Sequence, residues 1–221
     1  MNLLNEDNVV HIFFNKLGDI IISNLLFLLC CIPVITIGPA LTALYHCTLR
    51  MVKGNINGVV KTFFRAFKEN FKQSLIVWIC VLAAGFILIT DIRFLMYMGA
   101  SPVASALFYM TGGAIGVVLI FVLYIFPVIA AFANDLRTHV KNSFLFAFMH
   151  FFKTVLIALV TILPMVITYT DYKLLPLYAF CWFFFGFSLV AFINSFMFYK
   201  MFCPYLPLEE DIDDEKDQLL S

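Results

Sequence analysis

The longest uncharged stretch of the chain runs from Phe94 to Asn134 and reads FLMYMGASPVASALFYMTGGAIGVVLIFVLYIFPVIAAFAN. Gly99 and Pro102 predict a turn, after which a helix runs from about Pro102 to Pro127. A bilayer crossing takes roughly 20 apolar residues, because the hydrocarbon layer is about 30 Å thick. Inside lipid, each backbone amide must also find its partner within its own helix. The stretch therefore predicts a membrane-spanning helix.

Four further stretches lack Asp, Glu, Lys and Arg: Ile20–Leu49, Gln73–Thr90, Thr154–Thr170 and Leu174–Tyr199. The first is too long for one span. Its Pro33 and Gly38-Pro39 divide it into a crossing from Leu17 to Ile35 and a second helix from Pro39 to about Val52. We therefore expect an all-α, polytopic transmembrane helix bundle over residues 1–208. It has five spans, the fifth over 174–203, or six if the second helix also inserts.

Composition supports this fold class. The chain is 63% hydrophobic and 13% charged, whereas soluble domains are about 45–50% apolar and about 25% charged. A formal net charge of zero argues against a nucleic-acid partner, because such proteins need a basic surface. Glu6, Asp7, Lys16 and Asp19 precede the first span. This is not the positive start of a signal peptide, so we expect the segment to be retained.

The distribution of Lys and Arg predicts the orientation, because cytoplasmic loops carry the excess of positive charge. With five spans and an external amino terminus, three cations lie outside: Lys16, Arg93 and Lys173. Eleven lie inside: Arg50, Lys53, Lys61, Arg65, Lys68, Lys72, Arg137, Lys141, Lys153, Lys200 and Lys216. Six spans would move the amino terminus and Lys16 inside. Both alternatives place the carboxyl terminus in the cytoplasm of a multi-pass protein.

Residues 59–72 read VVKTFFRAFKENFK and predict an amphipathic cytoplasmic helix. One arc of about 100° carries Val60, Phe63, Phe64, Phe67 and Phe71, and an adjacent arc of about 60° carries Lys61, Arg65, Lys68 and Lys72. We interpret this helix as lying in the membrane interface, with its cations against an anionic inner leaflet. The alternatives are packing of the phenylalanines on other helices and docking into a partner's groove.

A weaker copy of this helix follows 81 residues later. Phe63, Ala66, Phe67, Phe71, Lys72, Leu75 and Ile76 align with Phe144, Ala147, Phe148, Phe152, Lys153, Leu156 and Ile157. In both copies the helix is expected to run directly into a span. Pro33-Val34-Ile35 and Pro127-Val128-Ile129 precede the two copies. We interpret residues 17–96 and 102–170 as parallel repeat halves with an insertion between Gly38 and Gly58; the alternative is chance similarity in a phenylalanine-rich chain.

Two blocks carry a family resemblance. They are IPVITIGPALTALY at residues 32–45 and FFRAFKENFKQ at residues 63–73. Together they resemble the signature of the YesL family of small bacterial integral membrane proteins, over roughly the first third of the chain. The resemblance implies a bacterial cell-membrane protein without an established activity, often encoded beside carbohydrate ABC-transporter genes.

Catalytic and cofactor motifs are absent from the sequence. It has no phosphate-binding Gly-x-x-x-x-Gly-Lys-Ser/Thr, no zinc-binding His-Glu-x-x-His and no Gly-x-Ser-x-Gly. The six cysteines include no Cys-x-x-Cys pair and are interpreted as small apolar residues. We therefore expect no enzyme activity, cofactor or metal.

Three local features complete the candidate sites. His46 could share a polar pocket with Thr36 and Gly38, or lie at the membrane interface. Gly112 and Gly116 form a close-packing Gly-x-x-x-Gly signal, within the protein or toward a partner. Residues 209–221 carry seven acids and one Lys, which predicts a disordered cytoplasmic tail that is either merely solvated or directed at basic groups.

Two functions fit these features. The first is a non-enzymatic accessory or regulatory protein that contacts carbohydrate ABC-transporter subunits through Lys61–Lys72. The second is a small solute transporter or channel whose site lies between the repeat halves, because repeated transporters bind substrate at that interface. The sequence does not determine the oligomeric state.

Overall fold

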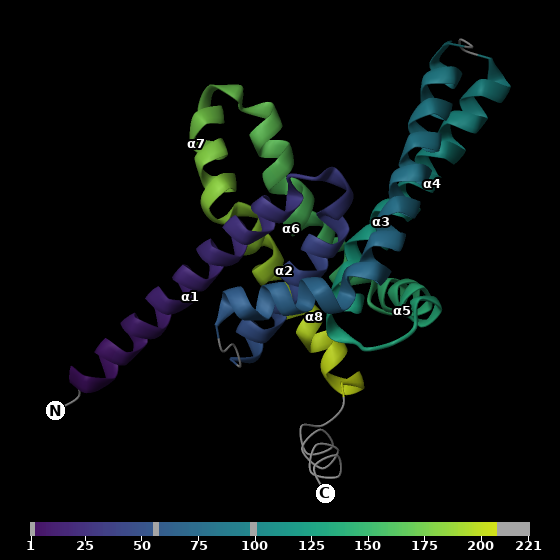
Figure 1. Ribbon diagram of the computed structural model, residues 1–221. Coiled ribbons are helices and arrows are strands. Elements are labelled where there is room, and N and C mark those ends of the chain that lie inside the picture. Colours follow the sequence, from purple (N-terminus) through teal and green to yellow (C-terminus); the bar gives the residue numbers. More distant parts are fainter. Residues whose placement is uncertain (1–2, 55–57, 98–100, 207–221) are drawn as a thin grey trace, which may run out of the picture.

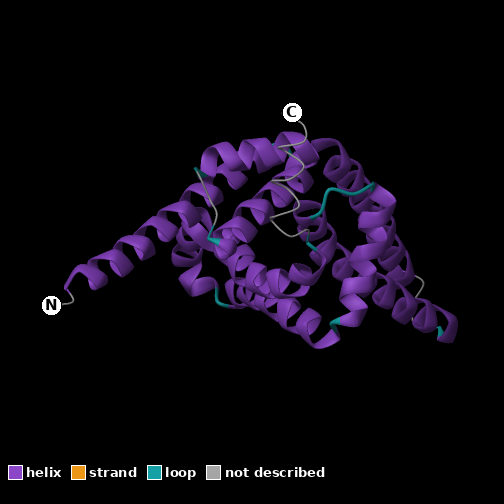
Figure 2. Cartoon of the chain, turned by 90° about the horizontal axis from the view of Figure 1, so that it is seen from below, coloured by secondary structure: helices purple, strands orange, loops and turns teal. Residues whose placement is uncertain are grey.

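The computed structural model describes residues 3–54, 58–97 and 101–206, and these form helices joined by short loops (Figures 1 and 2). The helices longer than ten residues are α1 (Leu3–Cys31), α2 (Ile37–Lys53), α3 (Val59–Tyr97), α4 (Pro102–Ala131), α5 (Leu136–Met149), α6 (Phe151–Thr170) and α8 (Phe187–Phe202). Shorter elements are η1 (Val34–Thr36), η2 (Tyr172–Leu174), α7 (Leu175–Cys181), η3 (Trp182–Gly186) and η4 (Cys203–Tyr205). The expected all-α fold is confirmed over the described part of the chain.

Five helical segments are long and apolar enough to cross a membrane. They are Phe14–Cys31, Val59–Tyr97, Pro102–Ala131, Phe151–Thr170 and Leu175–Tyr205. Their number agrees with the five spans expected from the uncharged stretches. The predicted helix after Pro39 is present as α2, but it is not among these candidate spans.

The helix α2 occupies the centre of the bundle (Figure 1). It contacts α1, α3, α4 and α8. Small side chains allow this close approach on several sides, because Ala40, Ala43 and Cys47 are completely buried. The segment that the repeat interpretation treats as an insertion is therefore the element around which the other helices pack.

Hydroxyl and amide side chains join the helices inside the bundle. Hydroxyl pairs link α1 to α8, α2 to α3, α2 to α8 and α4 to α6: Ser23–Ser188 at 2.6 Å, Thr42–Ser74 at 2.8 Å, Thr48–Ser195 at 2.8 Å and Tyr124–Thr154 at 2.7 Å. The Asn194 amide also donates to the Thr161 hydroxyl at 2.9 Å. Such bonds hold helices together in lipid, where apolar surface provides no driving force for association.

A π-helix, η3, connects α7 to α8. Asn24 of α1 supplies hydrogen-bond partners for backbone groups in and just after this π-helix. The Asn24 amide donates to the carbonyls of Trp182 at 3.1 Å and Phe183 at 2.7 Å. Its side-chain oxygen accepts from the Ser188 backbone N–H at 2.9 Å. One polar side chain therefore attaches α1 to the irregular turn of the last span.

The two predicted repeat copies differ in geometry. In the first, α3 runs without interruption from the amphipathic segment into the span, as expected. In the second, the chain breaks at His150 (φ −117°, ψ 47°), which separates α5 from α6. Pro33 lies in the break after α1, whereas Pro127 lies inside α4. The expectation that both helices run directly into a span therefore holds only for the first copy, because His150 leaves the helical conformation.

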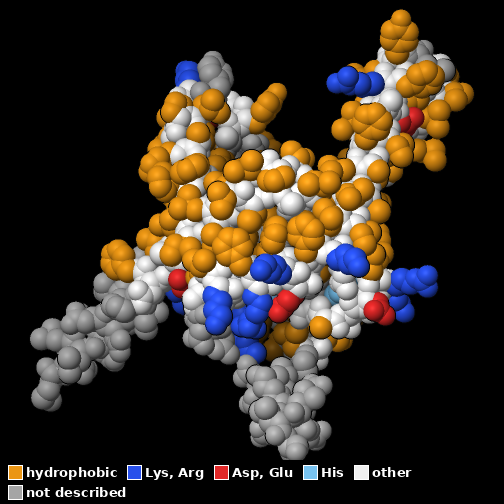
Figure 3. All heavy atoms as spheres, viewed as in Figure 1, with side chains coloured by type: hydrophobic (Ala, Val, Ile, Leu, Met, Phe, Trp, Pro, Cys, Tyr) orange, Lys and Arg blue, Asp and Glu red, His pale blue; other side chains and the backbone are white. Residues whose placement is uncertain are grey.

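Charged and apolar side chains occupy different levels of the molecule (Figure 3). Lys and Arg side chains gather along one end, which we call the basic face; it includes Arg50 and Lys53 at the end of α2 and the start of α3. Beyond it, apolar side chains cover the molecule, and two hairpins, α3–α4 and α6–α7, project away from the basic face (Figure 1). Phe86 and Tyr109 on the first hairpin are 74% and 78% exposed. An apolar surface of this extent is typical of lipid contact.

Candidate functional site

The amphipathic start of α3 is attached to the bundle by part of its phenylalanine arc. Phe63 is completely buried, and Phe67 and Phe71 are half-buried. Their rings follow one another along the helix, with centroids 6.5 Å apart for Phe63–Phe67 and 5.4 Å for Phe67–Phe71. Val60 and Phe64 remain exposed. The arc therefore serves packing inside the protein and also leaves apolar surface outside it.

The four predicted contact cations of α3 are all exposed: Lys61, Arg65, Lys68 and Lys72. They lie on the side of the helix adjacent to the phenylalanine arc. Because the buried phenylalanines hold the helix against the bundle, these cations are presented together on a fixed scaffold.

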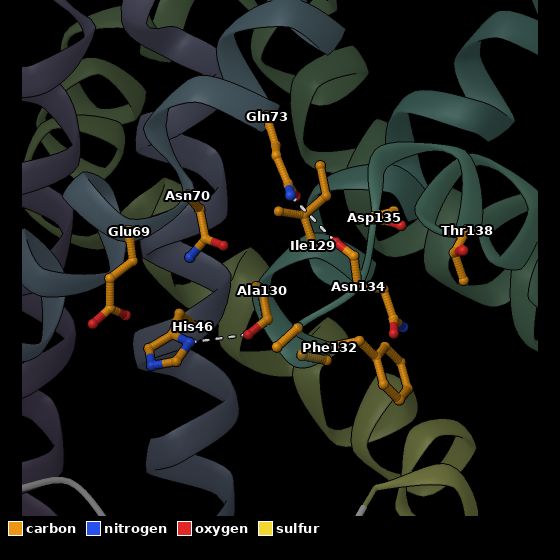
Figure 4. Close-up of a pocket in the computed structure, with 12 residues that line it drawn as sticks. His46, Glu69, Asn70, Gln73, Ile129, Ala130, Phe132, Asn134, Asp135 and Thr138 are labelled. Atoms are coloured by element: carbon orange, nitrogen blue, oxygen red, sulfur yellow. Dashed lines mark hydrogen bonds between the residues drawn. The ribbon is translucent and has the colours of Figure 1, made fainter.

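A polar groove of about 690 Å³ opens beside this helix. Its polar side chains come from α2, α3 and the segment that enters α5: His46, Glu69, Asn70, Gln73, Asn134, Asp135 and Thr138 (Figure 4). The end of α4, including Ala130 and Phe132, supplies the remaining wall. The groove therefore lies between the two predicted repeat halves, at the basic face.

His46 is fixed at one end of the groove. Its Nδ1–H donates to the Ala130 carbonyl at 2.9 Å (Figure 4), so Nε2 carries the lone pair. Burial lowers the pKa of His46; the Ala130 hydrogen bond and the Glu69 charge oppose this, and the Arg50 and Arg65 charges add to it. Burial therefore favours the neutral imidazole, in which Nε2 is a hydrogen-bond acceptor.

The amides of the groove also direct their donors to backbone carbonyls. Asn70 donates to Ala66 at 3.0 Å, and Gln73 donates to Asn134 at 3.2 Å. Their side-chain oxygens are left as acceptors, as are the carboxylates of Glu69 and Asp135. The groove is therefore rich in hydrogen-bond acceptors.

A second, smaller pocket of about 240 Å³ shares His46, Ala130 and Ala131 with the groove. Arg50, Lys53 and Tyr199 contribute its polar groups. His46 thus lines both an acidic, amide-lined groove and a basic pocket. The basic face has regions of opposite charge side by side.

The structure does not bring Thr36 and Gly38 together with His46. Thr36 binds the backbone of the turn before α2. Gly38 is packed against α3, since a Cβ added there would lie 2.5 Å from Trp78 Cβ and 2.8 Å from the Ser74 carbonyl. Eight residues of helix, about 12 Å of rise, separate Gly38 from His46. The groove that contains His46 is lined by other residues. They come from α3 and from the segment after α4, which lie beside a later part of α2 than Gly38.

The predicted packing pair Gly112 and Gly116 has no close neighbour in the described chain. No atom lies within 4 Å of a Cβ added at either position. The alternative in which the pair meets a partner remains a prediction. The predicted acidic tail at 209–221 lies outside the described residues.

Glu69, Asn70 and Gln73 were not identified from the sequence as candidate site residues. At 100° per residue they share an arc of about 100° between the basic and phenylalanine arcs, and this signal could have identified them. Asn134, Asp135 and Thr138 carry no comparable signal, because their place depends on how α4 and α5 are connected.

The helices, the apolar exterior and the basic-face groove define a small polytopic helical membrane protein. Residues 20–92 match the family model described as "Protein of unknown function, DUF624". The chain is 30% identical over 184 residues to the "Uncharacterized protein YesL" of Bacillus subtilis (strain 168), covering 80% of both chains. The chain belongs to the YesL family. No solved structure matches it.

Proposed function

We propose that the protein is a non-enzymatic accessory component of a membrane transport system that contacts its partner through the basic face. The observation that carries the proposal is the presentation of Lys61, Arg65, Lys68 and Lys72. These four cations are exposed on one helix, and that helix is anchored by the completely buried Phe63. A rigid row of cations favours an anionic surface, because opposite charges steer association and fix its register.

We further propose that the basic face is cytoplasmic and rests on the anionic inner leaflet of a bacterial cell membrane. The excess of Lys and Arg on this face supports the orientation. The exposed Val60 and Phe64 beside the cations support contact with the leaflet, because amphipathic helices bury such side chains at the lipid boundary. The carboxyl terminus is then cytoplasmic.

The proposed protein partner is a carbohydrate ABC-transporter subunit. The support is that the family resemblance implies a gene often encoded beside carbohydrate ABC-transporter genes. The groove around His46 adds acceptor groups beside the cations, so the same face can pair with acidic and basic groups of a partner.

Detergent pull-down from sugar-induced cells tests this proposal. The wild-type chain should recover a transporter subunit, and the variant Lys61→Gln/Arg65→Gln/Lys68→Gln/Lys72→Gln should recover at least several-fold less. A matched variant that neutralises Arg137, Lys141, Lys153 and Lys200 removes the same charge from other helices at the same end of the molecule and should retain recovery, because the proposed contact is made by α3. Isolation of the wild-type chain alone, or equal loss in both variants, would contradict the proposal.

A solute transporter is the second candidate, because the groove lies between the two predicted repeat halves. Proteoliposomes that contain the purified chain would then accumulate or release a solute. Loss of flux in His46→Ala with normal reconstitution would support this candidate over the accessory function.

A further inference from the structure

The turn between α1 and α2 lies against the first part of the α3 span. The Trp78 indole Nε1–H donates to the Val34 carbonyl at 2.8 Å. Trp78 is six residues beyond Lys72, the last cation of the amphipathic segment, and nineteen residues before Tyr97. At 1.5 Å per residue these separations are about 9 Å and about 28 Å along the helix. The turn is therefore deeper than the basic face but well short of the tip of the α3–α4 hairpin.

Side chains at this turn are apolar and open to the surroundings. Ile32 is 75% exposed, Val34 62% and Ile35 51%. A loop in water would gain from polar residues here, whereas contact with acyl chains favours this composition. The apolar surface of the neighbouring α3 continues from it in the same layer (Figure 3).

The backbone carbonyls of Cys30, Pro33 and Val34 around the break have hydrogen-bond partners. The Thr36 hydroxyl lies 2.6 Å from the Cys30 carbonyl oxygen and 2.7 Å from that of Pro33. The Thr36 backbone N–H also donates to Pro33 at 3.0 Å, and Trp78 satisfies Val34. Such pairing matters most in hydrocarbon, where no water can replace a missing hydrogen bond to a carbonyl.

Both arms of the turn lead back to the same end of the molecule. The helix α2 ends at the basic face with Arg50 and Lys53. The helix α1 begins at the end at which α8 finishes, and rises from there toward the turn (Figure 1). Lys16 of α1 precedes the apolar residues that approach the turn.

We propose that α1, η1 and α2 form a re-entrant hairpin whose apolar tip, Ile32, Val34 and Ile35, contacts the acyl chains of the leaflet next to the basic face. The amino-terminal segment then lies on the same side as the end of α8, and α1 does not cross the bilayer. Of the described Lys and Arg residues, eleven lie on this side and two, Arg93 and Lys173, lie opposite. If Lys16 were on the far side instead, the excess of cations on the basic-face side would be smaller. The rule that cytoplasmic segments carry the excess of Lys and Arg therefore favours the re-entrant arrangement.

Cysteine labelling tests which side the amino-terminal segment occupies. Full-length Lys16→Cys, Lys61→Cys and Lys173→Cys variants are treated with a membrane-impermeant maleimide in intact and in permeabilised cells, and the wild-type chain measures the background from its own cysteines. Lys16→Cys should follow Lys61→Cys and be protected under the condition that labels Lys173→Cys. Labelling of Lys16→Cys together with Lys173→Cys would overturn the proposal.

Depth-dependent quenching separates a re-entrant tip from a complete crossing. A fluorophore on Val34→Cys, in vesicles of phosphatidylglycerol and phosphatidylcholine, should be quenched by spin-labelled acyl chains and little by aqueous iodide. Tyr97→Cys at the end of α3 is the control and should respond to iodide. Ile32→Cys repeats the measurement at a second exposed tip position. Iodide quenching at both tip positions equal to that at Tyr97→Cys would contradict membrane insertion of the tip.

Discussion

Trp78 of α3 donates a hydrogen bond to the backbone carbonyl of Val34, 44 residues earlier in the chain, at 2.8 Å. The same indole packs against Gly38 and lies 6.1 Å from the Phe126 ring, measured between ring centroids. One side chain therefore joins the turn before α2 to α3 and α4. This contact fixes how far the α1–α2 hairpin enters the bundle.

Trp78→Phe should lower the thermal unfolding midpoint of the detergent-solubilised protein. The variant keeps an aromatic ring but leaves the Val34 carbonyl without its donor, a loss of about 1–3 kcal/mol. Val34→Ala is the matched control, because it trims an exposed side chain and keeps the carbonyl. Equal midpoints for Trp78→Phe and wild type would show that the bond contributes nothing to stability.

Gly38→Ala should also destabilise the fold, by about 1–3 kcal/mol, because its new methyl group would overlap Trp78 and the Ser74 carbonyl. Gly85→Ala is a matched change in α3, where no atom lies within 4 Å of an added Cβ. The thermal unfolding midpoint of Gly38→Ala should therefore be lower than that of Gly85→Ala. A tolerated Gly38→Ala would mean that α2 and α3 are not in close contact in solution.

Asn24→Leu should weaken the attachment of α1 to the last span. It removes the donor to the Trp182 and Phe183 carbonyls and the acceptor for the Ser188 N–H. The expected cost is about 1–3 kcal/mol, seen as a lower unfolding midpoint and faster proteolysis within α1. Asn142→Leu on α5 serves as the control. Unchanged proteolysis of Asn24→Leu would argue against this attachment.

Gly112→Leu should leave the unfolding midpoint of the monomer unchanged, since nothing in the described chain approaches this position. Size-exclusion chromatography with light scattering in detergent then compares the oligomeric state of the variant and the wild type, and so reports whether Gly112 and Gly116 contact a second copy. Substantial destabilisation of a monomeric sample would show that Gly112 is packed inside the protein.

The stability of the protein should decrease as the pH falls below about 6.5, the ordinary pKa of histidine. Burial lowers the pKa of His46 on α2 and of His139, a buried residue of α5, in the folded state. The unfolded chain therefore binds more protons than the folded chain between the lowered pKa and the ordinary one, and acid favours unfolding.

Thermal midpoints measured from about pH 5 to about pH 7.5 test this expectation. The variants His46→Gln and His139→Gln should each flatten the profile, and a glutamine at 46 can still donate to the Ala130 carbonyl. A wild-type unfolding midpoint that decreases as the pH is raised over this range would contradict the expectation. Unaltered slopes in both variants would exclude these two histidines as its cause.

Local properties of the chain determined which residues form the long apolar helices. Uncharged stretches such as Phe94–Asn134 were sufficient, because a helix in lipid must satisfy its own backbone and present apolar side chains all round. A break near Pro33 was also expected, but proline alone does not decide where a helix ends, because α4 continues past Pro127 to Ala131. The amphipathic start of α3 could be predicted from its period alone.

Only the tertiary structure decided which of these residues meet. Thr36 and Gly38 directly precede the predicted helix that carries His46, but in the structure Gly38 packs against Trp78, whereas His46 donates to the Ala130 carbonyl. The groove residues Glu69 and Asp135 come from segments whose meeting depends on the crossing of α3 and α4 beside α2. Hydropathy determines the environment of each helix, whereas small side chains and single hydrogen bonds between helices determine their arrangement, and these leave no periodic pattern in the sequence.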